Sequence, residues 1–143
     1  MQIYVGRRRR LKNTVLDGYA VIAFLFDEPG ADIVEDILAE AVDFVRPVFI
    51  SAVNWAEVLY IVRRWQGQAG VNKVLEFSRN MPFEIVPADV IRSEQAAEYK
   101  SAYRLSLADA FAVALAKEKR AELVTGDPEF KQVEKEIKIH WLR

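Results

Sequence analysis

Short apolar runs alternate with helix-length segments along this chain, and the alternation predicts an α/β fold. The apolar runs are partly β-branched and predict strands at residues 14–16, 48–50, 83–86, 122–125 and 137–142. Helical periodicity and end signals predict helices at residues 18–26, 31–45, 52–66, 71–79, 90–103, 105–117 and 128–134, with a break at Gly67 to Gly70. Short strands that alternate with helices are typical of a parallel sheet covered on both faces. We therefore expect a three-layer α/β/α sandwich with a central parallel sheet.

The predicted helix at residues 105–117 contains a carboxylate in unfavourable surroundings. Its sequence, LSLADAFAVALAK, is apolar on nearly every face, which is typical of a helix buried on all sides. Asp109 lies inside it, and an ionised carboxylate in apolar surroundings is costly unless a partner, hydrogen bonds or a metal compensates its charge. Three further acids occupy comparable positions: Asp17 and Asp127 lie at the ends of predicted strands, and Glu57 lies inside an apolar helix.

Each of these acids also has a local structural explanation. Asp17 and Asp127 precede predicted helices and could cap them. Ser106 and Asp109 are spaced as in a capping box. Glu57 lies well inside its helix and has no capping role, so its plain alternative is a partly exposed helix face.

Considered together, the four acids favour a carboxylate cluster. The carboxyl ends of parallel strands line the ligand crevice of such sheets, which brings Asp17 and Asp127 to the same edge. Crowded carboxylates repel one another, and a divalent cation relieves that repulsion. Oxygen ligands alone favour Mg²⁺ or Mn²⁺ over zinc or copper.

Composition excludes several other classes of site. The 143 residues include no cysteine and a single histidine, His140. A disulfide scaffold and a cysteine nucleophile are therefore excluded, and a multi-histidine zinc site or a Ser-His-Asp triad has little support. No apolar run approaches the roughly 20 residues of a membrane span, and the start of the chain lacks the apolar core of a signal peptide. We expect a cytoplasmic protein without a membrane partner.

Charge is distributed unevenly along the chain. Arg7, Arg8, Arg9, Arg10 and Lys12 give five positive charges before the first acid, whereas the whole chain has a net charge of −1, so the remainder carries six net negative charges. We expect a basic N-terminal extension at residues 1–13 and a single domain at residues 14–143. A run of like charges favours a solvated arm over an RNA-contacting one.

Four segments, in this order, resemble those of the PIN-domain ribonucleases: VLDGYAVIAFL, ISAVNWAEVLY, LSLADAFAVALAK and LVTGDPEF. The resemblance covers about residues 14–142 and is closest to the VapC-type toxins of prokaryotic toxin–antitoxin pairs. It implies a compact α/β/α sandwich with an acidic pocket that binds Mg²⁺ or Mn²⁺, and metal-dependent hydrolysis of RNA phosphodiester bonds. It further implies a cognate antitoxin and a homodimer.

Carried over by motif, the resemblance assigns metal-binding and catalytic roles to Asp17, Glu57, Asp109 and Asp127. It assigns Thr125 a hydrogen bond within the pocket. Tyr19 departs from the family pattern, which has a small polar residue two places after the first aspartate. A bulky ring there could narrow the pocket or replace a hydrogen bond, and this motivates an alternative function as a catalytically impaired protein-binding module. The same residue disfavours a haloacid-dehalogenase-type phosphatase, which has a second aspartate at that position.

Overall fold

The structure is a computed structural model, and it describes residues 12–143. The expected basic extension at residues 1–13 lies outside the described residues, except for Lys12 and Asn13. The elements, in order, are β1 (Asn13–Leu16), α1 (Gly18–Leu25), α2 (Ala31–Asp43), β2 (Val48–Ser51), α3 (Ala52–Arg79), β3 (Phe83–Val86), α4 (Val90–Ala102), α5 (Leu107–Lys119), β4 (Ala121–Thr125), the 3₁₀ helix η1 (Pro128–Val133) and β5 (Ile139–Trp141). The predicted alternation of strands and helices is confirmed.

The five strands form one sheet in the order β3-β2-β1-β4-β5, and all of them run parallel. Thr14 of β1 lies opposite Val48 of β2 on one side and Glu122 of β4 on the other. The chain therefore builds the sheet outward from β1, first to one edge and then to the other. A crevice forms outside the carboxyl ends of the strands where the strand order reverses, which here is beside β1 and β4.

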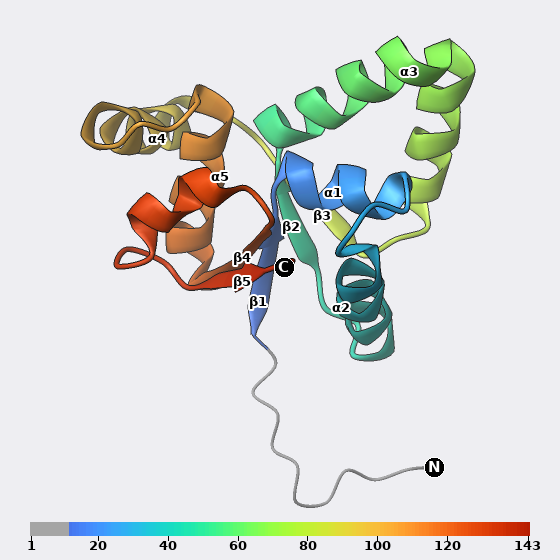
Figure 1. The fold of residues 1–143 in the computed structure, drawn as a ribbon, viewed down its shortest axis with the longest axis horizontal. Coiled ribbons are helices and arrows are strands. Elements are labelled where there is room, and N and C mark those ends of the chain that lie inside the picture. The colour runs from blue at the N-terminus through green and yellow to red at the C-terminus, as the bar shows by residue number, and fades with distance from the viewer. Residues whose placement is uncertain (1–11) are drawn as a thin grey trace, which may run out of the picture.

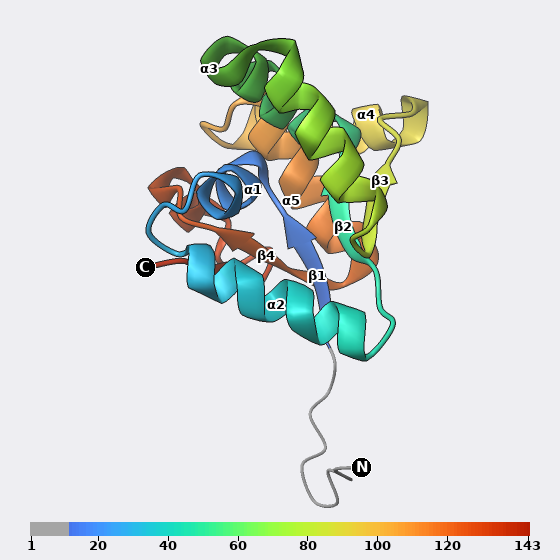
Figure 2. The same ribbon diagram turned by 90° about the vertical axis from the view of Figure 1, so that its right-hand side faces the viewer.

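Helices cover both faces of the sheet, which confirms the expected three layers (Figures 1 and 2). Helices α1, α2 and α3 lie on one face, and α5 lies on the other with α4 packed against it. Adjacent strand residues point to opposite faces, so Leu16 packs with α1, α2 and α3, whereas Val15 packs with α5. The core is thus divided by the sheet into two apolar clusters.

Helix α5 is buried as predicted, although its boundaries are shifted by two residues. All residues from Ala110 to Ala116 are buried. The helix begins at Leu107 because the side chain of Ser106 accepts a hydrogen bond from the backbone N–H of Asp109 and caps it. Among residues 12–143, no helix combines the length and the apolar character needed to cross a membrane.

The predicted break in the third helix occurs at one of its two glycines. Helix α3 runs from Ala52 to Arg79, and only Gly67 leaves helical geometry, with φ 69° and ψ −168°. Gly70 was expected to share the break, but it is helical and buried. The sequence prediction was therefore right about the kink and wrong about its extent.

Candidate metal centre

Asp17 links the end of β1 to the start of α1. Its side chain is 2% exposed. Its Oδ1 accepts a hydrogen bond from the backbone N–H of Ala20 at 2.8 Å, which caps α1. Its Oδ2 accepts a second hydrogen bond, from the hydroxyl of Thr125 at 2.6 Å. The capping interpretation is confirmed, but capping occupies only one of the two carboxylate oxygens.

Thr125 joins two of the predicted site acids. It is the last residue of β4 and is fully buried. Its hydroxyl donates to Asp17 and accepts from the backbone N–H of Asp127 at 3.0 Å. Asp127 in turn caps η1, because its Oδ1 accepts from the backbone N–H of Glu129 at 2.9 Å. The carboxyl ends of β1 and β4 are therefore connected through a single hydroxyl group.

Glu57 and Asp109 approach this connection from two helices. Glu57 lies in the second turn of α3, and its Oε1 would lie only 2.8 Å from a Cβ atom placed on Gly18. Glycine at position 18 thus allows the carboxylate to lie directly against the start of α1. Asp109 lies in the first turn of α5 and is half-buried.

The acids influence one another electrostatically. Burial and, to a smaller extent, the negative charges of Asp109 and Asp127 together raise the pKa of Asp17 to about 7. Burial likewise raises the pKa of Asp109 to about 6, with added repulsion from Asp127 and Glu57. Within residues 12–143, no salt bridge involves any of these four acids. The structure therefore places all five predicted site residues at the same end of the sheet, with their negative charge unneutralised by a basic side chain.

The donor set fits a hard divalent cation in its chemistry. Carboxylate oxygens and a hydroxyl group are ligands of the kind that Mg²⁺ and Mn²⁺ prefer. The described part of the chain nevertheless contains no group of three or more Asp, Glu or His side chains already gathered closely enough to hold an ion. The acids thus surround the end of the sheet without forming a ready-made coordination shell.

Tyr19, the departure from the family pattern, lies beside the acids without hydrogen-bonding to them. A Cβ atom on Gly126 would lie 2.3 Å from Cε1 of Tyr19, so the ring packs on the backbone between Thr125 and Asp127. The Tyr19 hydroxyl accepts a hydrogen bond from the Arg143 guanidinium at 2.6 Å. Tyr19 therefore does not replace the bond between Thr125 and Asp17.

Sequence reasoning missed Asn54, which lies one turn before Glu57. Asn54 is fully buried, and its Nδ2 donates to Glu57 Oε1 at 3.1 Å and to the backbone carbonyl of Ala108 at 3.3 Å. The available signal was its spacing of three residues from Glu57, which places both side chains on the same helix face.

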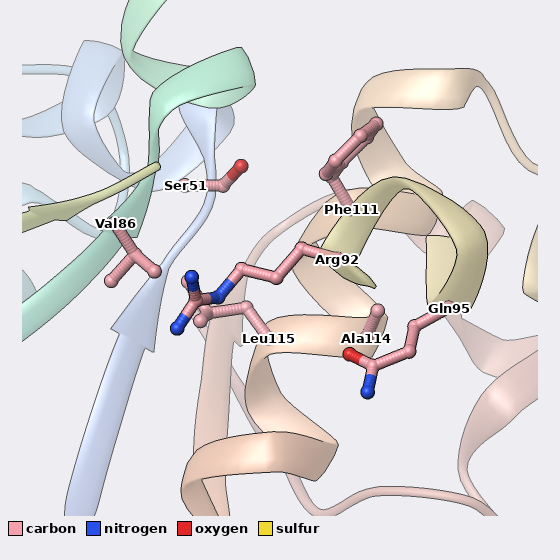
Figure 3. Close-up of a pocket in the computed structure, with 7 residues that line it drawn as sticks. All are labelled: Ser51, Val86, Arg92, Gln95, Phe111, Ala114 and Leu115. Carbon is pink, nitrogen blue, oxygen red and sulfur yellow. The ribbon is translucent and has the colours of Figure 1, made fainter. Parts of the chain in front are cut away.

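Two hollows in the described part of the chain lie away from the acids. One of about 10 Å³, room for about one water molecule, is lined by Ser51, Val86, Arg92, Gln95, Phe111, Ala114 and Leu115 (Figure 3). Another of about 210 Å³ is lined by Leu25, Phe26, Gln66, Gly70, Lys73, Val74 and Phe77. Since neither includes a predicted site residue, the acids are not part of either cavity.

Comparison with known proteins connects this geometry to one family. The family model described as PIN domain matches residues 14–136. Comparison with curated protein sequences found no match.

Solved structures with the same fold include DNA-bound VapBC from Salmonella typhimurium, at 14% identity over 93% of this chain and 100% of that chain, with a TM-score of 0.70. They include VapBC2 from Rickettsia felis bound to a promoter DNA fragment, at 20% identity over 90% and 98%, with a TM-score of 0.67. VapC20 from Mycobacterium tuberculosis, a sarcin–ricin loop cleaving toxin, matches at 14% identity over 85% and 95%, with a TM-score of 0.66. At these identities the likeness is one of fold.

Proposed function

This chain belongs to the PIN-domain family, and from that premise we propose that it is a divalent-metal-dependent endoribonuclease. PIN domains are typically nucleases and generally use divalent metals. The observation that carries the proposal is the buried Asp17 carboxylate, which is within electrostatic range of Asp109 and Asp127 and, among residues 12–143, forms no salt bridge with a basic side chain. Buried carboxylates whose pKa is shifted by burial and by neighbouring charges are found most often at functional sites.

The proposal gives each site residue a role. Asp17 and Asp109 would hold Mg²⁺ or Mn²⁺ most directly, and Glu57 and Asp127 would complete the site, directly or through water. The hydroxyl of Thr125 fixes the Asp17 carboxylate in one orientation. A bound ion would lower the pKa of a coordinated water and offset charge on the scissile RNA phosphate.

A histidine base has no part in this proposal. His140 lies in β5, where its Nδ1 is 3.9 Å from Oε2 of Glu122. Glu122 faces Lys12 and Lys138 instead of the acidic cluster. The chemistry is therefore assigned to the carboxylates and the cation that they would bind.

We also propose that the chain is the toxin of a toxin–antitoxin pair, forms a homodimer and binds a cognate antitoxin. The VapBC structures from Salmonella typhimurium and Rickettsia felis support this proposal. The described part of the chain also exposes large hydrophobic side chains that would be available for such contacts: Val42, Phe44, Val45, Tyr60, Trp65, Val90, Ile91 and Leu107. Sedimentation equilibrium should give the mass of a dimer, and a monomer at micromolar concentration would contradict the homodimer.

The alternative function is a protein-binding module that keeps the fold without cleaving RNA. Tyr19 favours it, because the ring packs on Gly126 directly between Thr125 and Asp127. Mn²⁺ binding separates this alternative from the nuclease, since a module with an occluded cluster needs no metal.

The decisive experiment measures Mn²⁺ binding by calorimetry and RNA cleavage, for wild type, Asp17→Asn and Asp109→Asn. Asp89→Asn is the matched control, because Asp89 caps α4 and bonds Arg92 away from the cluster. We expect both site variants to lose binding and cleavage together while the control keeps them. Wild-type cleavage by Asp17→Asn would refute the site assignment. An absence of Mn²⁺ binding in the wild type would refute the nuclease and favour the binding module.

A further inference from the structure

Asn54 is the buried polar residue whose presence neither the fold nor the four acids explain. The buried polar and charged residues in the described range are Asp17, Ser51, Asn54 and Thr125. Asp17 and Thr125 belong to the cluster, and Ser51 caps α3 by accepting from the backbone N–H of Val53. Asn54 neither caps a helix nor carries a charge, yet it is the one polar side chain of α3 that is buried.

The hydrogen bonds of Asn54 connect two parts of the candidate centre. Its Nδ2 group donates to Oε1 of Glu57 on the same helix and to the backbone carbonyl of Ala108 on α5. Both partners only accept hydrogen bonds, so the orientation of the amide follows from them. Ala108 directly precedes Asp109, so one amide nitrogen lies between two carboxylate-bearing segments.

The same Glu57 oxygen also faces α1. Oε1 would lie 2.8 Å from a Cβ atom on Gly18, the residue after Asp17. Asn54 therefore holds Glu57 with the oxygen directed at the start of α1. Asp109 and Glu57 repel each other, and the amide supplies a neutral donor that restrains this pair without cancelling the charge that a cation would need.

Stability alone does not account for this amide. Among the described residues its Oδ1 has no hydrogen-bond partner, although it is buried. A buried acceptor without a partner destabilises the fold, and an apolar side chain of the same size would remove that cost. The benefit of an asparagine at this position therefore comes from the two hydrogen bonds that its Nδ2 group donates.

We propose that Asn54 is a positioning residue that fixes the Glu57 carboxylate and ties α3 to the first turn of α5, so that Glu57 and Asp109 stay beside Asp17, from where a divalent cation would draw them into its coordination shell. This inference rests on the proposed metal-dependent function. Side chains that orient metal ligands typically change metal affinity about 10- to 100-fold when they are removed.

The test compares Asn54→Leu with Ser51→Ala by Mn²⁺ calorimetry, RNA cleavage and urea unfolding. Ser51→Ala is the matched control, because it removes a hydrogen bond from the same turn of α3 without touching Glu57. We expect Asn54→Leu to weaken Mn²⁺ binding at least about 10-fold and to lower kcat with little change in KM. We expect Ser51→Ala to lower only the urea midpoint. Wild-type Mn²⁺ affinity in folded Asn54→Leu would overturn the proposal. Asn54→Ala provides the same comparison if the leucine does not fit.

A double-mutant cycle keeps this inference separate from the proposed function. Urea unfolding of metal-free wild type, Asn54→Ala, Glu57→Gln and the double variant measures the coupling of the two side chains directly. Non-additive midpoints support the link between Asn54 and Glu57, even if the wild type binds no Mn²⁺ and the nuclease proposal fails. Additive midpoints overturn the link, whatever the outcome for cleavage.

Discussion

At the scale of single residues, Asp17 is where the fold and a negative charge conflict most strongly. Burial raises its pKa from 3.8 to about 7. The folded protein therefore holds this proton more tightly than the unfolded chain does, and the stability contributed by Asp17 is complete below about pH 4 and is lost as the pH rises to about 7. One pKa unit corresponds to about 1.4 kcal/mol, so the loss amounts to roughly 4 kcal/mol.

Urea unfolding of the metal-free protein between pH 4 and 8 tests this prediction. Asp17→Asn should remove most of the loss, because the amide carries no titrating proton. Other groups also make stability depend on pH. Arg92 lowers the pKa of Glu118, for example, so the stability that Glu118 contributes is lost as the pH falls. Subtracting the variant from the wild type removes these shared contributions. The same pH dependence in both proteins would show that Asp17 is not the group responsible.

The same protonation predicts how metal binding responds to pH. Protons and a divalent cation compete for the carboxylates of Asp17 and Asp109, whose pKa values are raised to about 7 and about 6. Mn²⁺ affinity should therefore increase on the order of 100-fold from pH 5.5 to 7.5 if both acids must lose their protons, and then level off. Calorimetry in buffers of different ionisation enthalpy should show proton release at the lower pH. A constant affinity across this range would contradict binding at these two acids.

Tyr19 allows a sharper test of the alternative function. Tyr19→Phe removes only the hydrogen bond with Arg143, and Tyr19→Ser also removes the ring that packs on Gly126. Because the ring does not bond to the acids, both variants should bind Mn²⁺ as the wild type does, within about twofold. Tyr19→Ser should lower the free energy of unfolding by about 1–3 kcal/mol, because part of a packed aromatic side chain is lost. Mn²⁺ binding gained by Tyr19→Ser alone would show that the ring blocks the centre.

From the sequence, Asp17, Asp109 and Asp127 were expected at the ends of strands and helices. Helix capping and metal binding were treated as alternatives for these acids, but the two roles are compatible. All three lie where helices begin, and Asp17 and Asp127 each cap a helix with one oxygen. Capping fixes the carboxylate and leaves the second oxygen for another partner, as Thr125 shows for Asp17. Asn54 could not be identified in the same way, because its contact with the carbonyl of Ala108 on α5 depends on tertiary packing.

At the scale of elements, α3 shows why two glycines of similar context behave differently. Gly67 has a positive φ, a backbone conformation that residues other than glycine rarely adopt. A Cβ atom there would meet nothing within 4 Å. Gly70 is helical, and a Cβ atom there would lie 2.5 Å from Cβ of Gln66 and 3.3 Å from Cγ1 of Val62. The sequence shows only two glycines three residues apart, and packing against the rest of α3 decides which of them bends the chain.

Gly67→Ala should therefore destabilise the protein through the backbone, since the surrounding space is open. Residues forced into such conformations cost about 1–3 kcal/mol, and the free energy of unfolding should fall by that amount. Ala69→Ser, at an exposed position two residues away, is the control and should change it by about 0.5 kcal/mol or less. Chemical denaturation measures both. An unchanged stability of Gly67→Ala would mean that α3 is continuous through residue 67.

At the scale of the whole molecule, the layers were predictable from the sequence but the strand order was not. Short apolar strands between helices indicate a parallel sheet, and all five strands are parallel. Placing β1 at the centre depends on contacts between strands that are distant in sequence, such as Val15 with Phe49 and with Leu123. Because β1 is central, Asp17, the residue that follows it, lies near Asp109 of α5 and near Asp127, which follows β4.

The domain boundary gives the last prediction. We propose that residues 14–143 form the single domain and that the basic run before it forms a solvated extension, although Asn13, counted with the extension from the sequence, is the first residue of β1. Deleting residues 1–11 should leave the free energy of unfolding and RNA cleavage unchanged, because the deletion keeps the ion pair of Lys12 with Glu122 and the hydrogen bonds of Asn13. Deleting residues 1–13 should cost about 1–3 kcal/mol, because Asn13 donates to the backbone of Lys119 and accepts from Arg46.

Asn13→Ala in the full-length chain is the point control for that difference and should reproduce most of the destabilisation. Thermal unfolding and cleavage of a generic RNA at two salt concentrations measure both properties. If deletion of residues 1–11 weakens RNA cleavage and flattens its dependence on salt while stability is unchanged, the arginine run contacts RNA phosphates. That result would replace the solvated-arm interpretation and would explain how a domain with net negative charge attracts a polyanion. An unchanged salt dependence would mean that the extension does not contact RNA. The domain and the cation that its acids would bind would then account for RNA binding.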